Sequence, residues 1–328
     1  MGTHRYNETL LETVGQKLPG RITPATFLMD ILCIGREAAY RRLRGEVPLT
    51  LEEAARLAKA LDISIDMILK TGNEKISSYR MSMTEFENPT ETDYRFLEES
   101  VELIRSAADD PLSRLSLSAN MFPRQLYLQC GNLTRFFLFK KNFHETGKQA
   151  KSYHQVFIPE RMRRVFRDSF EAYRQFKFIN FIFDRQIFID LVHNIKHFYS
   201  IGLIRKQDIV LLREDILKMI TYLENIAITG KYENGTQINL YISNINFVQN
   251  CYNIKIQDRY ISIMEAYILY GIVSTDKADY DRMEEWLLSK CRLSTMISIC
   301  GEPQRIAFFN EQRRMLETLV DAPGSIQK

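Results

Sequence analysis

The sequence has little of several features that would assign it to a class at once. Its 328 residues include only five cysteines, at wide spacings and without a Cys-x-x-Cys pair, which argues against a disulfide framework and a zinc module. No apolar run reaches the roughly 18 residues of a membrane span, and residues 1–11 lack the apolar core of a signal peptide. We therefore expect a soluble, cytoplasmic protein without membrane association.

Neither sign of charge is in large excess. The sequence has 44 Lys and Arg residues and 41 Asp and Glu residues, for a net charge of only +3. Such a balance gives no general attraction to nucleic acid, so any contact with DNA must come from a local cluster of cations. The chain is longer than the roughly 250–300 residues at which a single core stops growing. Two domains are therefore expected.

Residues 7–69 have the pattern of five short helices separated by brief turns. Thr23 followed by Pro24 is typical of a helix cap and a first helical residue. Thr50 and Glu53 have the spacing of a capping box at the start of a later helix. This density of short helices predicts a small helical domain at the N-terminus.

The remaining chain has a different pattern, in which longer helices dominate. Apolar periodicity predicts helices over residues 91–108, 123–142, 159–184, 186–199 and 206–230. Alternation over 237–246, Tyr- and Ile-rich segments within 252–274 and the stretch 295–300 predict four strands. The expected fold class is mainly α, with a five-helix N-terminal domain and a larger, mostly helical α+β domain whose small antiparallel sheet lies near the C-terminus. The predicted organisation is a helix-turn-helix domain over 1–72, a linker over 73–90 and a dimerisation or sensing domain over 91–328.

The third predicted helix, residues 36–44, contains four arginines and one glutamate, a local excess equal to the net charge of the whole chain. A three-residue turn joins it to the preceding helix, a geometry that holds the second helix of the pair clear of the body. Ala39, Tyr40 and Leu43 fall on the side that can bury. We predict contacts with base edges from Arg36, Glu37, Ala38 and Arg41, and contacts with phosphates from Thr23, Arg42 and Arg44.

These residue types suit DNA for separate reasons. The guanidinium of arginine bonds guanine bidentately or clamps a phosphate. Ala38 is small enough to allow close approach and to touch a thymine methyl, and Glu37 can accept a hydrogen bond from cytosine. Thr23 begins a helix, where phosphate is attracted. The alternative interpretation is a solvated or protein-binding helix face.

Residues 23–69 resemble the Cro/phage-repressor type of helix-turn-helix, also called the XRE type. The resemblance rests on the apolar residues Leu28, Leu32 and Ile34 and on the runs Arg44–Pro48 and Leu57–Asp66. It implies a homodimer that binds a two-fold symmetric site in double-stranded DNA, with half-sites about one helical turn apart.

The C-terminal domain contains no recognisable catalytic motif, since a Gly-x-Ser-x-Gly elbow, a phosphate-binding loop and a dinucleotide fingerprint are all missing from the sequence. His193 and His197 have the spacing of two metal ligands, but ordinary histidines are the better interpretation. The aromatic residues within 176–188 are typical of a core, and an aromatic-lined effector cavity is the alternative.

Together these patterns predict a sequence-specific, DNA-binding transcriptional regulator that is not an enzyme and uses no cofactor or metal. Its partners would be double-stranded DNA, a second copy of the chain, and a small-molecule or protein effector. Two other functions stay open: a protein-interaction adaptor, and an enzymatic C-terminal domain that the helix-turn-helix directs to DNA.

Overall fold

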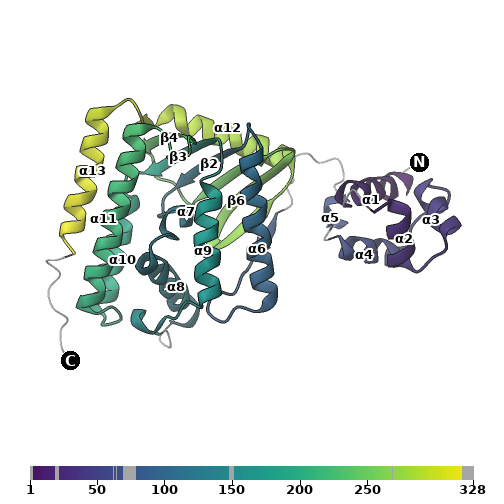
Figure 1. Cartoon of the computed structure of the whole chain (residues 1–328), viewed down its shortest axis with the longest axis horizontal. Coiled ribbons are helices and arrows are strands. Elements are labelled where there is room, and N and C mark those ends of the chain that lie inside the picture. The colour runs from purple at the N-terminus through teal and green to yellow at the C-terminus, as the bar shows by residue number, and fades with distance from the viewer. Residues whose placement is uncertain are drawn as a thin grey trace. The chain divides into compact units, whose positions relative to one another are not determined.

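The computed structural model describes residues 3–18, 22–61, 63, 65–68, 79–147, 151–267 and 269–319. The chain divides into two units, Met1–Ser78 and Tyr79–Lys328 (Figure 1). Their boundary falls within the predicted linker over 73–90. The short strand β1 (Arg80–Ser82), in the same stretch, pairs with a strand of the second unit. The structured part of the second unit therefore begins earlier than residue 91.

Small helices enclose one apolar core in the N-terminal unit. Val14, Leu28, Ala39 and Leu57 are fully buried there and come from four different helices. The predicted capping box is present, because the Thr50 hydroxyl accepts from the Glu53 amide and the Glu53 carboxylate accepts from the Thr50 amide. The elements are α1 (Thr3–Lys17), α2 (Pro24–Leu32), α3 (Arg36–Leu43), α4 (Leu51–Ala60) and α5 (Ile65–Ile68).

The expectation of five N-terminal helices is wrong. Within residues 3–18, 22–61 and 65–68 there are four helices of at least eight residues, and α5 is a single turn of four. Four helices thus supply most of the core of this unit, and α5 packs the half-buried Ile65 and Ile68 against it.

An eight-stranded mixed sheet forms the centre of the second unit, in the order β1-β7-β6-β5-β2-β3-β4-β8. The central strands β2, β3 and β4 are parallel to one another, and the other pairs are antiparallel. The strands after β1 are β2 (Arg114–Ala119), β3 (Phe178–Asp184), β4 (Gln237–Ser243), β5 (Cys251–Ile256), β6 (Arg259–Tyr267), β7 (Tyr270–Ser274) and β8 (Thr295–Met296).

The expectation of a small antiparallel sheet near the C-terminus is therefore wrong. Two central strands account for much of the error: β2 was not predicted, and β3 lies inside the stretch 159–184 that was predicted as one helix. Strand β3 is apolar along most of its length, as parallel central strands are. Without a glycine or proline before it, such a run looks like the continuation of a buried helix.

Helices cover both faces of this sheet. Helices α6 and α9 lie in front of it in Figure 1, and the main core on that side includes Phe181 and Phe183 of β3. Ile182, which points to the opposite face, packs with Leu287 of α12. The helical elements are α6 (Glu91–Arg105), η1 (Ser106–Asp109), α7 (Arg124–Tyr127), α8 (Gly131–Thr146), η3 (Tyr153–Gln155), α9 (Glu160–Tyr173), α10 (Ile187–Ser200), α11 (Lys206–Thr229), α12 (Lys277–Leu293) and α13 (Glu302–Glu317).

A row of polar side chains crosses the α12 face of the sheet at one level. The residues are register partners in five adjacent strands. Three of the four neighbouring pairs bond at 2.7–3.4 Å, and Glu284 of α12 accepts from Asn253 at 3.0 Å and from Ser116 at 3.5 Å. These internal partners offset the cost of burying polar groups. The row consists of Asn239, Asn180, Ser116, Asn253 and Ser262.

The other features singled out in the C-terminal sequence have structural positions. Phe176, Phe181, Phe183 and Phe188 are at most 1 % exposed and pack in the main core. His193 and His197 lie on the exposed side of α10. Among the helices of the described ranges, none combines the length and apolar character needed to cross a bilayer.

Gly301, at the start of α13, provides a test of the close approach between this helix and Met296 of β8. Its φ is +68°, and a Cβ there would lie 2.4 Å from the carbonyl oxygen of Met296. Gly301→Ala should lower the free energy of unfolding by about 2–4 kcal/mol, because left-handed strain and a backbone clash add. Urea unfolding, followed through the fluorescence of Trp286 on α12, measures the loss.

Gly202→Ala is the matched control. Gly202 has a φ of +77° but no heavy atom within 4 Å of the added Cβ, so only the backbone strain of about 1–2 kcal/mol remains. Equal losses in the two variants would contradict the close approach of Met296.

Candidate nucleic-acid interface

The turn between α2 and α3 lies where the sequence predicts it. Helix α2 ends at Cys33, whose φ of 55° and ψ of 46° are left-handed, and the Ile34 amide donates to the Met29 carbonyl at 3.3 Å. Gly35 then caps the N-terminus of α3. This short reversal makes α2 and α3 a helix-turn-helix pair.

Helix α3 is attached to the unit chiefly through one small side chain. Ala39 is its fully buried residue, whereas Leu43 is half-buried. Tyr40 was expected to bury, but it is 37 % exposed, and the Arg36 guanidinium lies over its ring at 5.7 Å. Much of the helix surface is therefore open to solvent, as a helix that enters a DNA groove requires.

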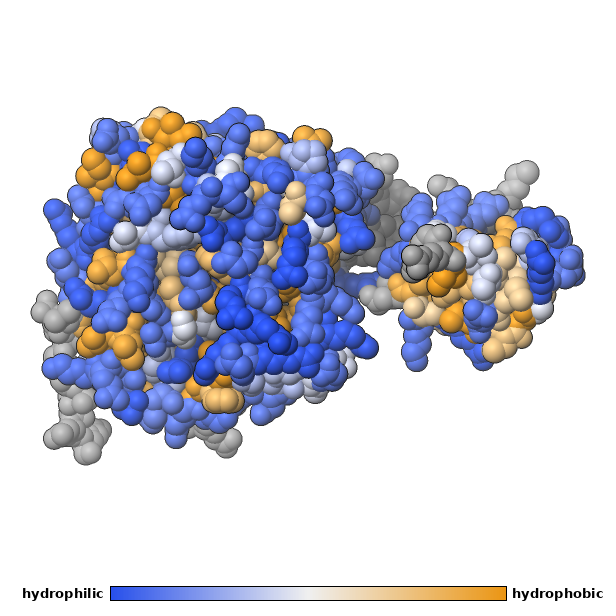
Figure 2. Space-filling view, in the orientation of Figure 1, coloured by the Kyte–Doolittle hydropathy of each residue, from blue (hydrophilic) through white to orange (hydrophobic). Residues whose placement is uncertain are grey.

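The four predicted base-contacting residues gather on this open surface. Arg36, Glu37 and Arg41 are exposed, and Ala38 between them is half-buried. Hydrophilic side chains cover the α3 end of the N-terminal unit in the view of Figure 2. The exposed surface of α3 thus carries two guanidinium groups and one carboxylate.

The exposed charges beside α3 form a loose surface network. Arg44 donates to Glu46 at 2.6 Å and lies 3.8 Å from Glu37, and Arg41 lies 3.5 Å from Glu46. The hydrogen bond from Arg44 lowers the pKa of Glu46. Solvent screens exposed pairs of this kind, which contribute little to stability, so a phosphate can replace Glu46 as the partner of either arginine at little cost.

Arg42 occupies a different environment from the other arginines of α3. Its side chain is 15 % exposed, and its guanidinium donates to the Glu53 carboxylate at 2.6 and 3.3 Å and to the Ala38 carbonyl at 3.2 Å. The sequence predicts a phosphate contact for Arg42, but in the structure its guanidinium bonds Glu53 of α4. Arg42 is therefore better described as a residue that fixes α3 against the start of α4.

Thr23 serves as the N-cap of α2. Its hydroxyl accepts from the Thr26 amide at 3.2 Å and lies 2.9 Å from the Thr26 hydroxyl. The residue is exposed, so a phosphate can approach the N-terminus of this nine-residue helix.

The structure adds Tyr40 to the exposed residues of α3. The sequence had assigned Tyr40 to the core because its amphipathic spacing was the only signal.

Comparison with known families agrees with this geometry. Residues 9–88 match the family model of the BetR domain. The BetR match identifies a helix-turn-helix-type DNA-binding domain, and it includes the whole α2–α3 pair and every residue of the predicted interface. It also extends past β1 into the second unit. No curated protein and no solved structure matches the chain.

The BetR match supports a DNA-binding regulatory role for the N-terminal unit. The finer resemblance to the XRE type stays a prediction from the sequence. Residues 89–328 lie outside the match, so the function of the sheet-containing unit has to be argued from its own structure.

The Arg42–Glu53 pair can be tested through local stability. Arg42→Met should destabilise the N-terminal unit by about 1.5–3 kcal/mol at pH 7, the range for hydrogen bonds to charged groups. Hydrogen–deuterium exchange of peptides from α3 and α4 in the full chain measures this loss. Arg41→Met, at a position that is 51 % exposed, is the control and should change stability by less than about 0.5 kcal/mol.

The same pair predicts a pH dependence. Burial alone would raise the pKa of Glu53, but hydrogen bonds from Arg42 and the Thr50 amide outweigh it and bring the pKa below the usual 4.5. A carboxylate with a lowered pKa contributes stability above its unfolded pKa and loses it as pH falls through the folded value. The difference between wild type and Arg42→Met should therefore shrink below pH 4.5. Free carboxylates titrate at about pH 3.9–4.3. A difference in stability between the two proteins that stays constant down to about pH 3 would therefore contradict the pairing.

Proposed function

We propose that this protein is a sequence-specific transcriptional regulator that binds DNA through α3 as a homodimer. The observation that carries the proposal is the exposure of Arg36 and Arg41 on a short helix whose buried residue is Ala39. The BetR match over the same residues supports DNA as the partner. We further propose that the helix-turn-helix is of the XRE type.

In this proposal α3 lies in the major groove. Arg36 and Arg41 bond base edges there, Glu37 discriminates against wrong bases, and Ala38 allows close approach. Arg44 and Thr23 contact phosphates on either side and set the register on the duplex. Arg42 touches no DNA and instead fixes the angle of α3 through Glu53.

For the second unit we propose dimerisation and the sensing of an effector, by binding and not by catalysis. A helix-turn-helix dimer positions two recognition helices about one helical turn apart on DNA. Since the N-terminal unit is small, the larger unit is the better source of a dimer interface.

Selection of bound duplexes from a random pool tests the function directly. The full chain should enrich a two-fold symmetric site with half-sites about 10 base pairs apart, because each protomer presents one α3. Enrichment of a single half-site would contradict the homodimer. A failure to enrich any sequence at low salt would contradict DNA reading and favour a protein-docking role.

Two arginine variants separate base reading from phosphate contact. Arg41→Ala should relax the preference at one base pair by about 1–3 kcal/mol. Arg44→Ala should instead weaken binding to all sequences alike and reduce the slope of log K against log salt by about one unit. Fluorescence anisotropy on a duplex series at several salt concentrations measures both quantities.

Arg105→Ala provides the control for the loss of one positive charge. Arg105 lies in the second unit, is 48 % exposed and pairs with Glu102. It should leave affinity, base preference and salt slope unchanged. An equal loss of affinity on every duplex for Arg41→Ala would reject a base-reading role for Arg41.

A further inference from the structure

The second unit contains a cavity of about 290 Å³ between helices α6 and α9 and strands β5 to β7. Its volume is close to the lower end of the roughly 300–1,000 Å³ of small-molecule sites. The walls are mainly apolar, with Leu97 and Val101 from α6, Phe166 from α9, and Ile254 and Ile263 from the sheet. Such a lining favours an apolar body of a ligand.

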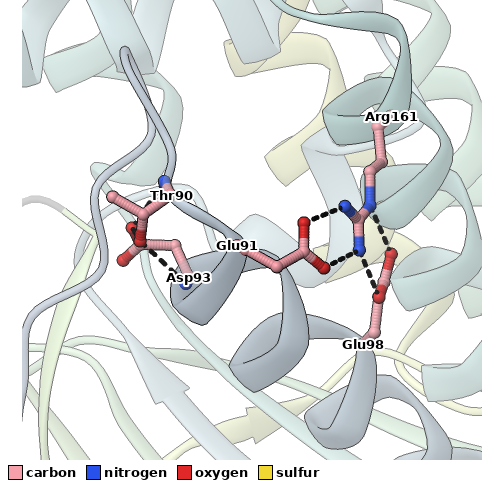
Figure 3. Close-up of polar contacts among 5 residues, drawn as sticks. All are labelled: Thr90, Glu91, Asp93, Glu98 and Arg161. Atoms are coloured by element: carbon pink, nitrogen blue, oxygen red, sulfur yellow. Dashed lines mark hydrogen bonds and ion pairs between the residues drawn. The ribbon is translucent and has the colours of Figure 1, made fainter.

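The helices on one side of the cavity are held in place by a charged clamp. Arg161 of α9 bonds both Glu91 and Glu98 of α6 through four contacts of 2.7–3.0 Å (Figure 3), and its guanidinium lies 4.2 Å from the Tyr94 ring centroid. Thr90 and Asp93 cap the start of α6 beside this clamp. These polar contacts join α6 to α9 outside the cavity, in addition to the apolar contacts of Leu97 with Met162 and Phe166.

One charged residue lines this apolar space among the described residues. Arg124 of α7 faces it together with Tyr127 and Leu128, which are three and four positions further along the chain. The side chain keeps accessible surface, and since it lines the cavity, that surface is available to a ligand. Within the described ranges, no hydrogen bond from its guanidinium is found.

The carboxylate whose charge acts on Arg124 does not accept a hydrogen bond from it. Glu265 of β6 accepts from Asn250 at 2.8 Å and from the Tyr252 hydroxyl at 2.6 Å. Burial raises the pKa of Glu265, and the positive charge of Arg124 opposes that rise. The guanidinium thus has a charged neighbour, but its hydrogen-bonding capacity stays directed to the cavity. A half-buried guanidinium that lines an apolar cavity without a hydrogen-bond acceptor is costly, and a ligand carboxylate would accept from it bidentately.

We propose that this cavity binds a small amphipathic carboxylate, with its carboxylate on Arg124 and its apolar body between α6, α9 and the sheet. A single cation in an apolar lining suits a monoanion better than a phosphate ester, which needs several donors and cations. The lining includes the exposed residues Phe96 and Thr275. In this proposal the ligand enters the cavity beside them. The regulatory meaning of this binding rests on the proposed function, whereas the binding itself does not.

The position of the cavity connects it with the chain segment that leaves the N-terminal unit. Strand β1 pairs with β7, where Arg80 lies opposite Val273, a lining residue. Thr84 and Phe86, which follow β1, also line the cavity. A ligand there would contact residues of the second unit that lie within the BetR match.

Three probes with equal chain length and different head groups test the proposal by calorimetry on the full chain: octanoate, 1-octanol and octylamine. Octanoate should bind at least about tenfold more tightly than octanol, since a charge-assisted hydrogen bond contributes that much, and octylamine should not bind. Equal affinity for octanoate and octanol would overturn recognition by Arg124. Absence of binding by octanoate and octanol alike would overturn the site.

Variants assign the effect to residues. Arg124→Met should lower octanoate affinity about tenfold or more and leave octanol binding intact. Ser169→Leu, which fills the cavity from α9, should weaken both. Arg163→Met, at a 52 % exposed position on α9, should change neither. Unfolding followed through Trp286 checks that each variant folds.

These measurements contain no DNA, so failure of the carboxylate site and failure of the proposed function are distinguishable. Octanoate binding without selection of any duplex would overturn only DNA reading. Selection of a duplex by a chain that binds no octanoate would overturn only the site. If Arg124→Met does not fold, Ser169→Leu with the octanoate-to-octanol ratio still decides between a charged site and an apolar void.

Discussion

The exposure of α3 to solvent depends on the small number of its residues that contact the rest of the N-terminal unit. Ala39 brings the helix close to the core, and the pair between Arg42 and Glu53 fixes its last turn against α4. A larger residue in place of Ala39 would push the helix away, and loss of the ion pair would let it rotate. The exposed arginines can address a groove only because these two attachments define the orientation of the helix that carries them.

Arginine serves different purposes at different positions of the described residues, and burial together with the available partner decides which. Arg41 and Arg44 are about half exposed and pair loosely with Glu46, so their guanidinium groups can exchange a carboxylate for a phosphate. Arg42 and Arg161 are less exposed and bond carboxylates in bidentate fashion, which stabilises the contact between two helices. Arg124 has a cavity in front of it. A count of cations along the sequence cannot separate these roles.

Much of the N-terminal unit could be predicted because its signals are local. The Thr23-Pro24 start of α2 and the Thr50–Glu53 capping box each lie within four residues. The central strands β2 and β3 were missed, although β2 carries a local signal. Leu115 and Leu117 alternate with Ser116 and Ser118, and this period of two places the leucines in the main core and Ser116 in the polar row under α12.

The interactions that matter most for function were beyond local patterns. Arg42 and Glu53 are eleven residues apart and meet only because α3 and α4 pack at a particular angle. The cavity is built from α6, α7, α9 and three strands whose order differs from their order in the chain, so no window of sequence contains it. Its connection to the BetR match is topological: β1 follows the N-terminal unit in the chain and is an edge strand beside β7. An edge strand has one hydrogen-bonded neighbour, so β7, which lines the cavity with Val273, is the strand that holds β1 in the sheet.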